Sequence, residues 1–187
     1  MTKIIKHQSI LLFSLFALSV MLIGCEKSTD QPDDKYTGKA NGLRNGELWN
    51  AECKAIISSS YPNELYLYID RYNEYKERRE AIVVARIEMN EGVFNIVNGL
   101  ALSPKPNYSS HYASFVADGD AIDGEYLVLE TDSNYLEITK IDLGTKDFFG
   151  SFNVAFLKDT TFNINPNLPD TLWFTEVEFQ TKIQESW

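Results

Sequence analysis

The chain contains little histidine and little cysteine, two residues of each among 187. Zinc sites use mainly these two residue types, and a disulfide framework needs several cysteines, so neither is expected. The sequence also lacks a G-x-S-x-G nucleophile elbow and a complete phosphate-binding loop. We therefore expect no cofactor, and neither serine hydrolysis nor nucleotide binding is indicated.

Basic residues are also scarce, with 17 Lys and Arg against 27 Asp and Glu and a formal net charge of −10. A body of this charge repels the phosphates of nucleic acids and anionic lipid headgroups. The composition therefore predicts that the chain has no nucleic-acid partner. One uncharged apolar run stands out, the 14 residues from Ile10 to Ile23. It is shorter than the roughly 20 residues that a membrane-spanning helix needs.

This run belongs to a pattern typical of a bacterial lipoprotein signal. Lys3 and Lys6 precede the run, and Gly24-Cys25 follows it directly. We expect cleavage before Cys25 and lipidation of its thiol, with further acylation by a chain such as palmitate. Two or three acyl chains hold a protein stably at a membrane, whereas one holds it only marginally. The membrane is thus the expected partner of Cys25.

The next segment is polar and has no apolar periodicity. We therefore expect residues 1–24 to be a signal peptide, residues 25–45 a flexible tether, and residues 46–187 a single β-rich domain. A domain of about 140 residues is long enough to enclose one sizeable core.

Period-two alternation of apolar and polar residues dominates the rest of the chain, and turn residues interrupt it at short intervals. The pattern predicts an all-β fold, an antiparallel β-sandwich of about nine strands, with a lipocalin-like β-barrel as the alternative. The expected strands are 48–57, 64–72, 81–89, 93–97, 111–117, 125–130, 135–142, 148–157 and 171–183. The core residues expected from the alternation are Trp49, Ala51, Cys53, Leu67, Ile69, Val83, Ala85, Ile87, Phe94, Phe115, Leu127, Ile138, Phe152, Val154, Phe174 and Phe179.

Few residues suggest chemistry. Cys53 falls on the apolar face of the first expected strand, where a free cysteine acts as a small hydrophobe. His111, with Ser109, Ser110 and Ser114 nearby, lacks the arrangement that a catalytic triad requires. We predict no catalytic residue from either pattern.

The best metal candidate is the acidic turn that contains Asp118, Asp120 and Asp123. Clustered carboxylates on a loop suit calcium, but the spacing does not fit the calcium-binding loop of EF-hands. Two Asp-Gly turns between strands are the simpler interpretation.

Tyrosines are frequent, and exposed rings on a sheet suit a sugar or a partner protein. Tyrosine is also a common strand residue whose hydroxyl reaches water, and we favour that interpretation for Tyr66, Tyr68, Tyr72 and Tyr75.

Two segments carry a family resemblance. Residues 136–142 (LEITKID) followed by residues 149–154 (FGSFNV) resemble the I-x-I-T-x-x-D … G-x-F motif of small lipoproteins of the Bacteroidetes type, a largely uncharacterised β-rich family. Residues 45–51 (NGELWNA) resemble the opening N-G-x-x-W-x-A strand of that family, while TEVEF at 175–179 departs from its usual T-N-G-x-F ending. The resemblance implies an architecture and a compartment rather than an activity. Gly150 indicates a bulge or a close backbone approach, and Phe152 should pack in the core.

In such bacteria, acidic residues soon after the lipidated cysteine resemble a signal for export to the outer face. Glu26, Asp30, Asp33 and Asp34 fit this pattern. The expected location is the cell envelope, anchored by lipid in the outer membrane and facing either the periplasm or the cell surface.

The sequence as a whole predicts a non-enzymatic envelope β-domain that binds or displays something, with a glycan or an envelope protein as its partner. Two alternatives stay open, namely a glycan hydrolase with paired carboxylates and a carrier of a small apolar ligand. Carboxylates paired in a cleft would favour the enzyme, a deep apolar cavity the carrier, and an exposed aromatic patch the binding domain.

Overall fold

The computed structural model of the chain describes residues 38–98, 108–161 and 165–185. The expected signal peptide and Cys25 lie outside the described residues. Across the described ranges, no helix has the length and apolar character needed to cross a membrane. The described part of the chain is all-β, as the sequence predicts, with ten strands rather than about nine. The strands are β1 (Gly38–Arg44), β2 (Glu47–Ile57), β3 (Glu64–Tyr72), β4 (Arg78–Glu88), β5 (Gly92–Val97), β6 (Tyr108–Phe115), β7 (Ile122–Val128), β8 (Tyr135–Asp142), β9 (Asp147–Lys158) and β10 (Thr171–Gln184).

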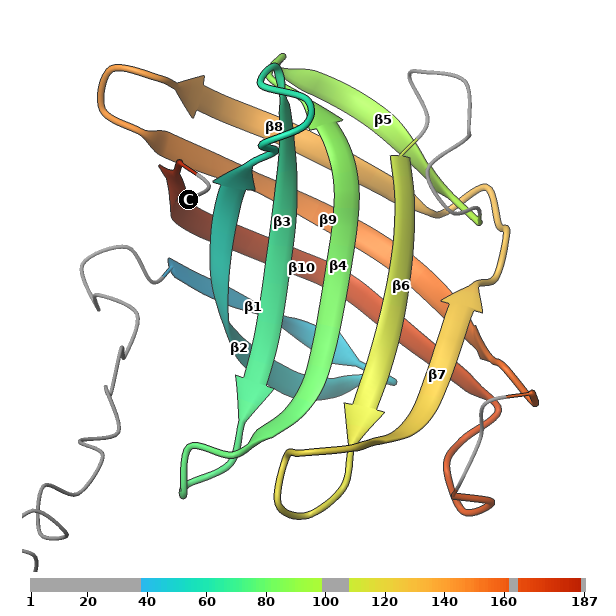
Figure 1. Cartoon of the computed structure of the whole chain (residues 1–187). Helices are drawn as coiled ribbons and strands as arrows, with labels where there is room; N and C mark the ends of the chain where they lie inside the picture. Colours follow the sequence, from blue (N-terminus) through green and yellow to red (C-terminus); the bar gives the residue numbers. More distant parts are fainter. Residues whose placement is uncertain (1–37, 99–107, 162–164, 186–187) are drawn as a thin grey trace, which may run out of the picture. The chain divides into compact units, whose positions relative to one another are not determined.

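The ten strands form one sheet that closes into a ring. Figure 1 shows β2, β3, β4, β6 and β7 side by side in one layer, here called the front layer, with β1, β8, β9 and β10 crossing obliquely behind it as the back layer. Strand β5 joins the layers by pairing with β6 and β8. The sheet is mixed rather than purely antiparallel, because β5 pairs in parallel with β6 and β2 with β10.

Two short strands complete the ring where longer strands diverge. The parallel contact between β2 and β10 covers only Ala55–Ile56 and Ile183–Gln184, and β1 pairs with both strands beyond it. Strand β7 bridges β6 and β9 in the same way. Each of the ten described strands therefore has at least two hydrogen-bonded neighbours. A ring of this kind leaves no long free edge for a further strand to join.

Strand β1 corrects the expected tether, because residues 38–44 belong to the sheet. Its inward positions are small, with Gly38 and Ala40 buried, so the sequence shows no apolar alternation there. A Cβ on Gly38 would come within 2.2 Å of the Gln180 carbonyl oxygen, which shows how closely β1 packs on β10. Asn45 and Gly46 both have positive φ, 52° and 81°, and turn the chain directly into β2.

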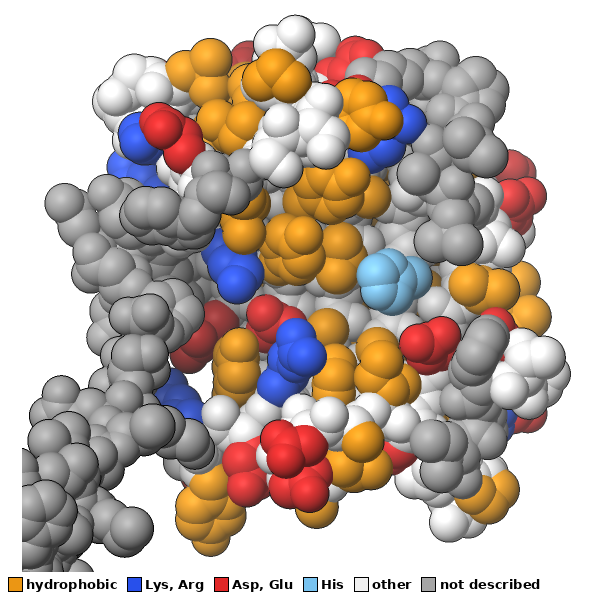
Figure 2. All heavy atoms as spheres, viewed as in Figure 1, with side chains coloured by type: hydrophobic (Ala, Val, Ile, Leu, Met, Phe, Trp, Pro, Cys, Tyr) orange, Lys and Arg blue, Asp and Glu red, His pale blue; other side chains and the backbone are white. Residues whose placement is uncertain are grey.

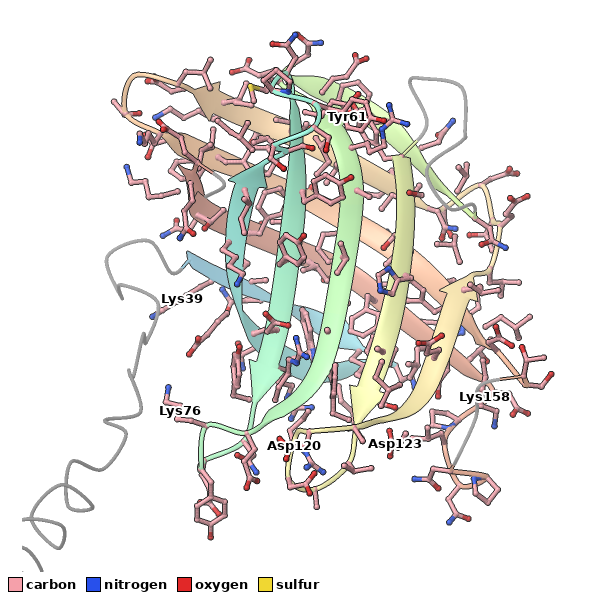
Figure 3. The ribbon with its side chains drawn as sticks, in the orientation of Figure 1. Lys39, Tyr61, Lys76, Asp120, Asp123 and Lys158 are labelled. Atoms are coloured by element: carbon pink, nitrogen blue, oxygen red, sulfur yellow. The ribbon has the colours of Figure 1, made fainter. Side chains whose placement is uncertain are left out.

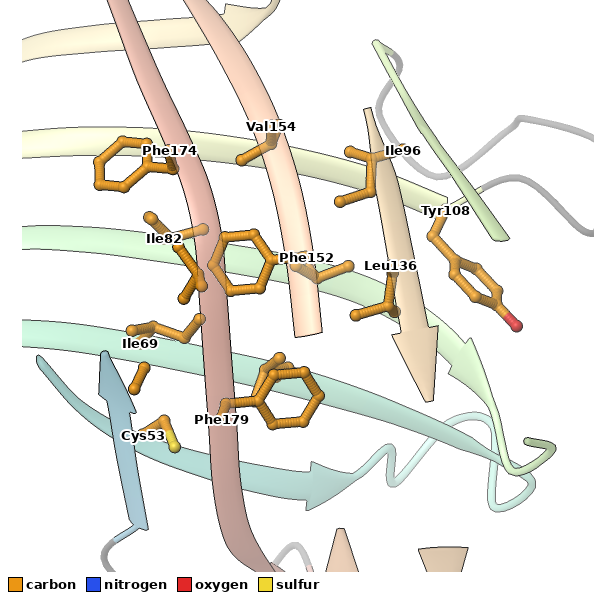
Figure 4. Close-up of a cluster of buried hydrophobic side chains, with 14 of the residues drawn as sticks. Cys53, Ile69, Ile82, Ile96, Tyr108, Leu136, Phe152, Val154, Phe174 and Phe179 are labelled. Carbon is orange, nitrogen blue, oxygen red and sulfur yellow. The ribbon is translucent and has the colours of Figure 1, made fainter. Parts of the chain in front are cut away.

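The core lies between the two layers and is rich in aromatic side chains. Figure 4 shows Phe152 and Val154 of β9 and Phe174 and Phe179 of β10 directed toward residues of the front layer such as Ile82. The Trp49 and Phe174 rings meet edge to face with centroids 5.0 Å apart. These rings occupy interior volume that a carrier would leave for its ligand.

Most of the expected core residues are buried, but three predictions are wrong. Val83 and Ala85 are half-buried on the outer surface, while Ile82, Val84 and Ile87 point inward. The reason is a β-bulge near Arg86, whose φ is 60°, where the pairing of β3 with β4 shifts register. Leu127 is also wrong, because it lies outside and is 43% exposed between buried Tyr126 and Val128. Ala51 and Phe94 are half-buried and pack against the core.

Candidate functional site

The outward side chains of the front layer form a continuous surface, here called the front face. One row runs straight across five strands, because each residue is paired with the next in the sheet. The row consists of Lys54, Tyr68, Val83, His111 and Leu127. In a sheet with one solvated face, outward positions are usually polar, whereas this row is mainly apolar or aromatic.

The row beside it is equally apolar. Ile56 is paired with Tyr66, and Ala85 lies outward on the neighbouring strand. The Tyr66 and Tyr68 rings lie with centroids 6.3 Å apart and planes 22° from parallel, and the Lys54 ammonium stands 5.6 Å from the Tyr68 centroid. Figure 2 shows hydrophobic side chains uncovered in the middle of this face, with the pale blue histidine at their margin. The structure thus places two of the four tyrosines, Tyr66 and Tyr68, side by side on the outer surface of strand β3.

A small apolar cluster continues the front face toward the β3–β4 turn. It contains Ala81, Ala113 and Phe115, each at most 8% exposed. The Arg78 guanidinium lies 4.1 Å from the centroid of the Phe115 ring and 3.7 Å from Asp70 Oδ1. The Arg78 guanidinium thus covers the Phe115 ring and is paired with Asp70 at this end of the face.

The apolar surroundings of the front face shift the pKa of several of its titratable groups. Burial raises the pKa of Asp70, although Arg78 and Lys54 act in the opposite direction. Burial likewise raises the pKa of Tyr68 and Tyr72 and lowers the pKa of His111. In each case loss of water disfavours the charged form of the side chain.

A second candidate site lies on the outer surface of the back layer. It is a groove of about 520 Å³, here called the back groove, that crosses β1, β10, β9 and β8. Its lining side chains are mostly polar and come from outward positions of these strands. They are Lys39, Asn41, Glu137, Thr139, Phe149, Ser151, Glu178 and Gln180, and Gly150 and the buried Phe179 complete the lining from below.

Two paired rows order the lining of the back groove. Asn41, Glu178, Ser151 and Glu137 follow one another across the four strands. The next row places Lys39, Gln180 and Phe149 side by side, so one aromatic ring lies among polar groups. Lys39 is labelled at the margin of the molecule in Figure 3. Ser151 Oγ donates to Glu137 Oε2 at 3.3 Å, and Lys140 Nζ lies 5.2 Å from the Phe149 centroid.

The family-like motif builds the floor of this groove. Leu136, Ile138 and Phe152 are buried in the core, as expected for a structural motif. A Cβ on Gly150 would lie 2.1 Å from the Glu137 carbonyl oxygen, which confirms the close backbone approach. The residues between these inward positions point outward and line the groove.

A buried charge cluster lies at one end of the core. Glu80 is 6% exposed and accepts hydrogen bonds from Trp49 Nε1 at 3.0 Å and Arg71 Nη1 at 2.8 Å. Arg44 Nη1 lies 3.4 Å from the same carboxylate. The cluster compensates the buried carboxylate and ties β1, β2, β3 and β4 together, so we assign it to the fold.

A loop-lined hollow of about 670 Å³ lies at the opposite end. Tyr61, labelled in Figure 3, stands over the Arg86 guanidinium at 4.7 Å, and Arg86 donates to Glu64 at 2.8 Å. These charged groups are satisfied by one another.

The residues considered for catalysis do not converge. Cys53 is buried, its thiol donates to the Gln180 carbonyl oxygen at 3.6 Å, and burial raises its pKa to about 12. Such a thiol is protonated at neutral pH and is a poor nucleophile. His111 points outward, whereas Ser110 and Ser114 point inward and donate to the Val83 carbonyl oxygen and to Asp123.

The carboxylates of Asp118 and Asp123, two of the three residues of the calcium candidate, have different partners. Asp118 Oδ1 accepts the backbone N–H of Asp120 within an exposed turn. Asp123 instead accepts Ser114 Oγ at 2.6 Å and Asn165 Nδ2 at 3.3 Å, so both of its oxygens are engaged. Among the described residues, no group of three or more His, Cys, Asp or Glu is arranged to hold a metal ion.

Comparisons with known proteins give no match to a family model, to a curated protein or to a solved structure. The front face and the back groove are therefore identified as candidate sites by their geometry alone. Sequence reasoning missed both surfaces, because each is assembled from four or five strands whose register is not visible in the sequence.

Proposed function

We propose that this chain is a non-enzymatic, lipid-anchored domain of the bacterial cell envelope whose front face binds an envelope protein. The observation that carries the proposal is the apolar surface around Tyr66 and Tyr68. Contiguous exposed apolar patches are uncommon on proteins that act alone and mark surfaces of interaction.

A protein fits the front face better than a glycan. Aromatic residues at the centre and charged residues at the rim are the usual composition of a protein interface. The centre offers few hydrogen-bonding groups, since Ile56, Val83 and Ala85 surround the tyrosines. Among the described strands, strand addition has no long free edge to use, so a partner has to bind to the face itself.

The anchor rests on the Gly24-Cys25 pattern, and the outer-membrane location rests on the resemblance to Bacteroidetes-type lipoproteins. We expect the full chain to incorporate an alkyne analogue of palmitate in cells and the Cys25→Ala variant to incorporate none. Equal labelling of both proteins would refute the anchor without bearing on the front face.

Photocrosslinking in intact cells tests the front face. A benzoylphenylalanine placed at Tyr68 should capture a defined envelope protein, whereas the same residue at Phe149 on the back layer should not capture it. The captured protein, once purified, should bind the full chain and lose at least tenfold in affinity for the Val83→Glu variant, because the new charge would be desolvated in the interface. Identical adducts from both positions would exclude a specific front-face partner.

A further inference from the structure

The back groove is a second surface with a chemistry unlike that of the front face. Its outward side chains supply two carboxylates, two amides, two hydroxyls and one ammonium around a single aromatic ring. A ligand of this groove has to form hydrogen bonds, since an apolar partner would leave the polar groups desolvated and unpaired.

Several polar side chains of the groove have no partner within the described part of the chain. Asn41, Glu178 and Gln180 are exposed, and their side chains make no hydrogen bond or ion pair to other described residues. They stand next to one another across β1 and β10. Their donors and acceptors are therefore available to a ligand from outside.

Other groups of the groove are held in place. Ser151 donates to Glu137, and the tight packing of Gly150 on β8 fixes the backbone beneath both residues. Phe149 is half-buried beside Gln180, with Lys140 near its ring. The groove thus combines a positioned ring and carboxylate with free amides and a free carboxylate.

We propose that the back groove binds a neutral saccharide. Sugar hydroxyls both donate and accept hydrogen bonds, which matches carboxylates, amides and hydroxyls arranged in rows. The apolar face of a sugar ring can pack against the flat, hydrophobic face of the Phe149 ring. Two carboxylates against one lysine leave the lining negative, so an acidic sugar is repelled. This inference is independent of the proposed front-face partner.

Binding rather than cleavage is the role that the groove supports. Glu137 and Glu178 lie on strands that flank β9, so their backbones are separated by two strand spacings, about 9–10 Å. Inverting glycosidases hold their carboxyl groups about 6.5–9.5 Å apart, but their general acid works in surroundings that keep it protonated at neutral pH. Glu178 is exposed on an open surface rather than enclosed in a cleft.

The test uses the full chain, purified in a detergent without a sugar headgroup, on an array of defined glycans. The neutral probes are chitopentaose, cellopentaose and maltopentaose, and the acidic probes are sialyllactose and oligogalacturonate. We expect retention of at least one neutral probe and of neither acidic probe. Failure to retain any neutral probe, or stronger retention of an acidic one, would overturn the proposal.

Variants then assign the binding to the groove. Phe149→Ala and the nearly isosteric Glu178→Gln should each weaken the retained probe at least tenfold, and Tyr68→Ala on the front face should change it less than twofold. Glu178 has no partner to lose among the described residues, so its variant keeps the test valid if Phe149→Ala folds poorly. Loss with Tyr68→Ala but not with Glu178→Gln would overturn the assignment. Release of new reducing ends from the probe would overturn a purely binding role.

Discussion

The front face and the back groove are outer surfaces of one closed sheet, yet they treat charge in opposite ways. On the front face, burial raises the pKa of Asp70 despite the nearby Arg78 and Lys54. On the back layer, Lys140 and Lys182 donate to Asp147 at 2.7 and 2.6 Å and lower the pKa of its carboxyl group. Burial is the largest influence on the pKa of Asp70 even though Arg78 is paired with it, whereas hydrogen bonds from two lysines are the largest influence on the pKa of Asp147.

This difference indicates what each surface gains on binding. A partner on the front face would release water from apolar side chains, which is a non-directional driving force. A ligand in the back groove would exchange water for hydrogen bonds to fixed groups, which contributes less net free energy and more selectivity. The two surfaces therefore suit two classes of partner. A substitution on one surface should then leave binding at the other surface unchanged.

The largest expected effect concerns the core that both surfaces share. Trp49 is 2% exposed and donates to Glu80, so Trp49→Ala should lower the free energy of unfolding by about 3–5 kcal/mol. Tyr68→Ala, on the outer side of the front layer, should lower it by less than about 1.5 kcal/mol. Chemical denaturation measures both. A comparable loss from Tyr68→Ala would mean that the front face serves folding rather than binding.

A smaller effect is expected at the floor of the back groove. Gly150→Ala places a methyl group against the Glu137 carbonyl oxygen and the Phe179 ring, so it should destabilise by about 1–3 kcal/mol. The adjacent Ser151→Ala variant, which changes an outward side chain, should stay within about 1 kcal/mol of the parent. Thermal unfolding of the two variants side by side compares them. If Gly150→Ala proved neutral, the groove floor would be more adaptable than its packing indicates.

The smallest expected effect is a change in the pH dependence of stability, measured for variants of two carboxylates. The pKa of Asp147 is lowered by folding, so its charge stabilises the fold above its unfolded value of about 3.8, and this stabilisation is lost as pH falls below that value. The Asp147→Asn variant should therefore be less stable than the parent at pH 7, with a deficit that shrinks in acid.

Asp70→Asn is the matched control on the front face and should show the opposite sign. Because folding raises the pKa of Asp70, its charge opposes folding at neutral pH, and the neutral amide should be slightly more stable there. The gain should fade as pH drops through the raised pKa and Asp70 becomes protonated. Denaturant midpoints between pH 2 and pH 7 measure both variants, and shifts of the same sign would remove the contrast between the surfaces.

The sequence predicts the strands better than the faces they present. The expected ranges 64–72 and 135–142 coincide with β3 and β8, because turn residues bound a clear alternation there. In β4 the run AIVVA is apolar on both sides, so alternation alone does not say which side is inward. The bulge near Arg86 then shifts the inward positions by one residue for the rest of the strand.

The candidate sites were hidden for a related reason. The Asn45-Gly46 turn is a strong hairpin signal, but the small residues of β1 conceal the strand that precedes it. Without β1, the row from Asn41 to Glu137 lacks its first residue and the groove lacks one wall, so the back groove does not emerge from the sequence. The alignment of Tyr68 with His111 depends likewise on the registers of three strands.

The strand β1 also determines where the folded domain can be shortened. Its backbone is hydrogen-bonded to β2 on one side and β10 on the other, so removing it would expose two ladders at once. Unpaired ladders are templates for joining other chains. A protease that cuts ahead of Gly38 would leave all ten described strands intact, whereas one that cuts within residues 38–44 would leave a fragment prone to aggregate.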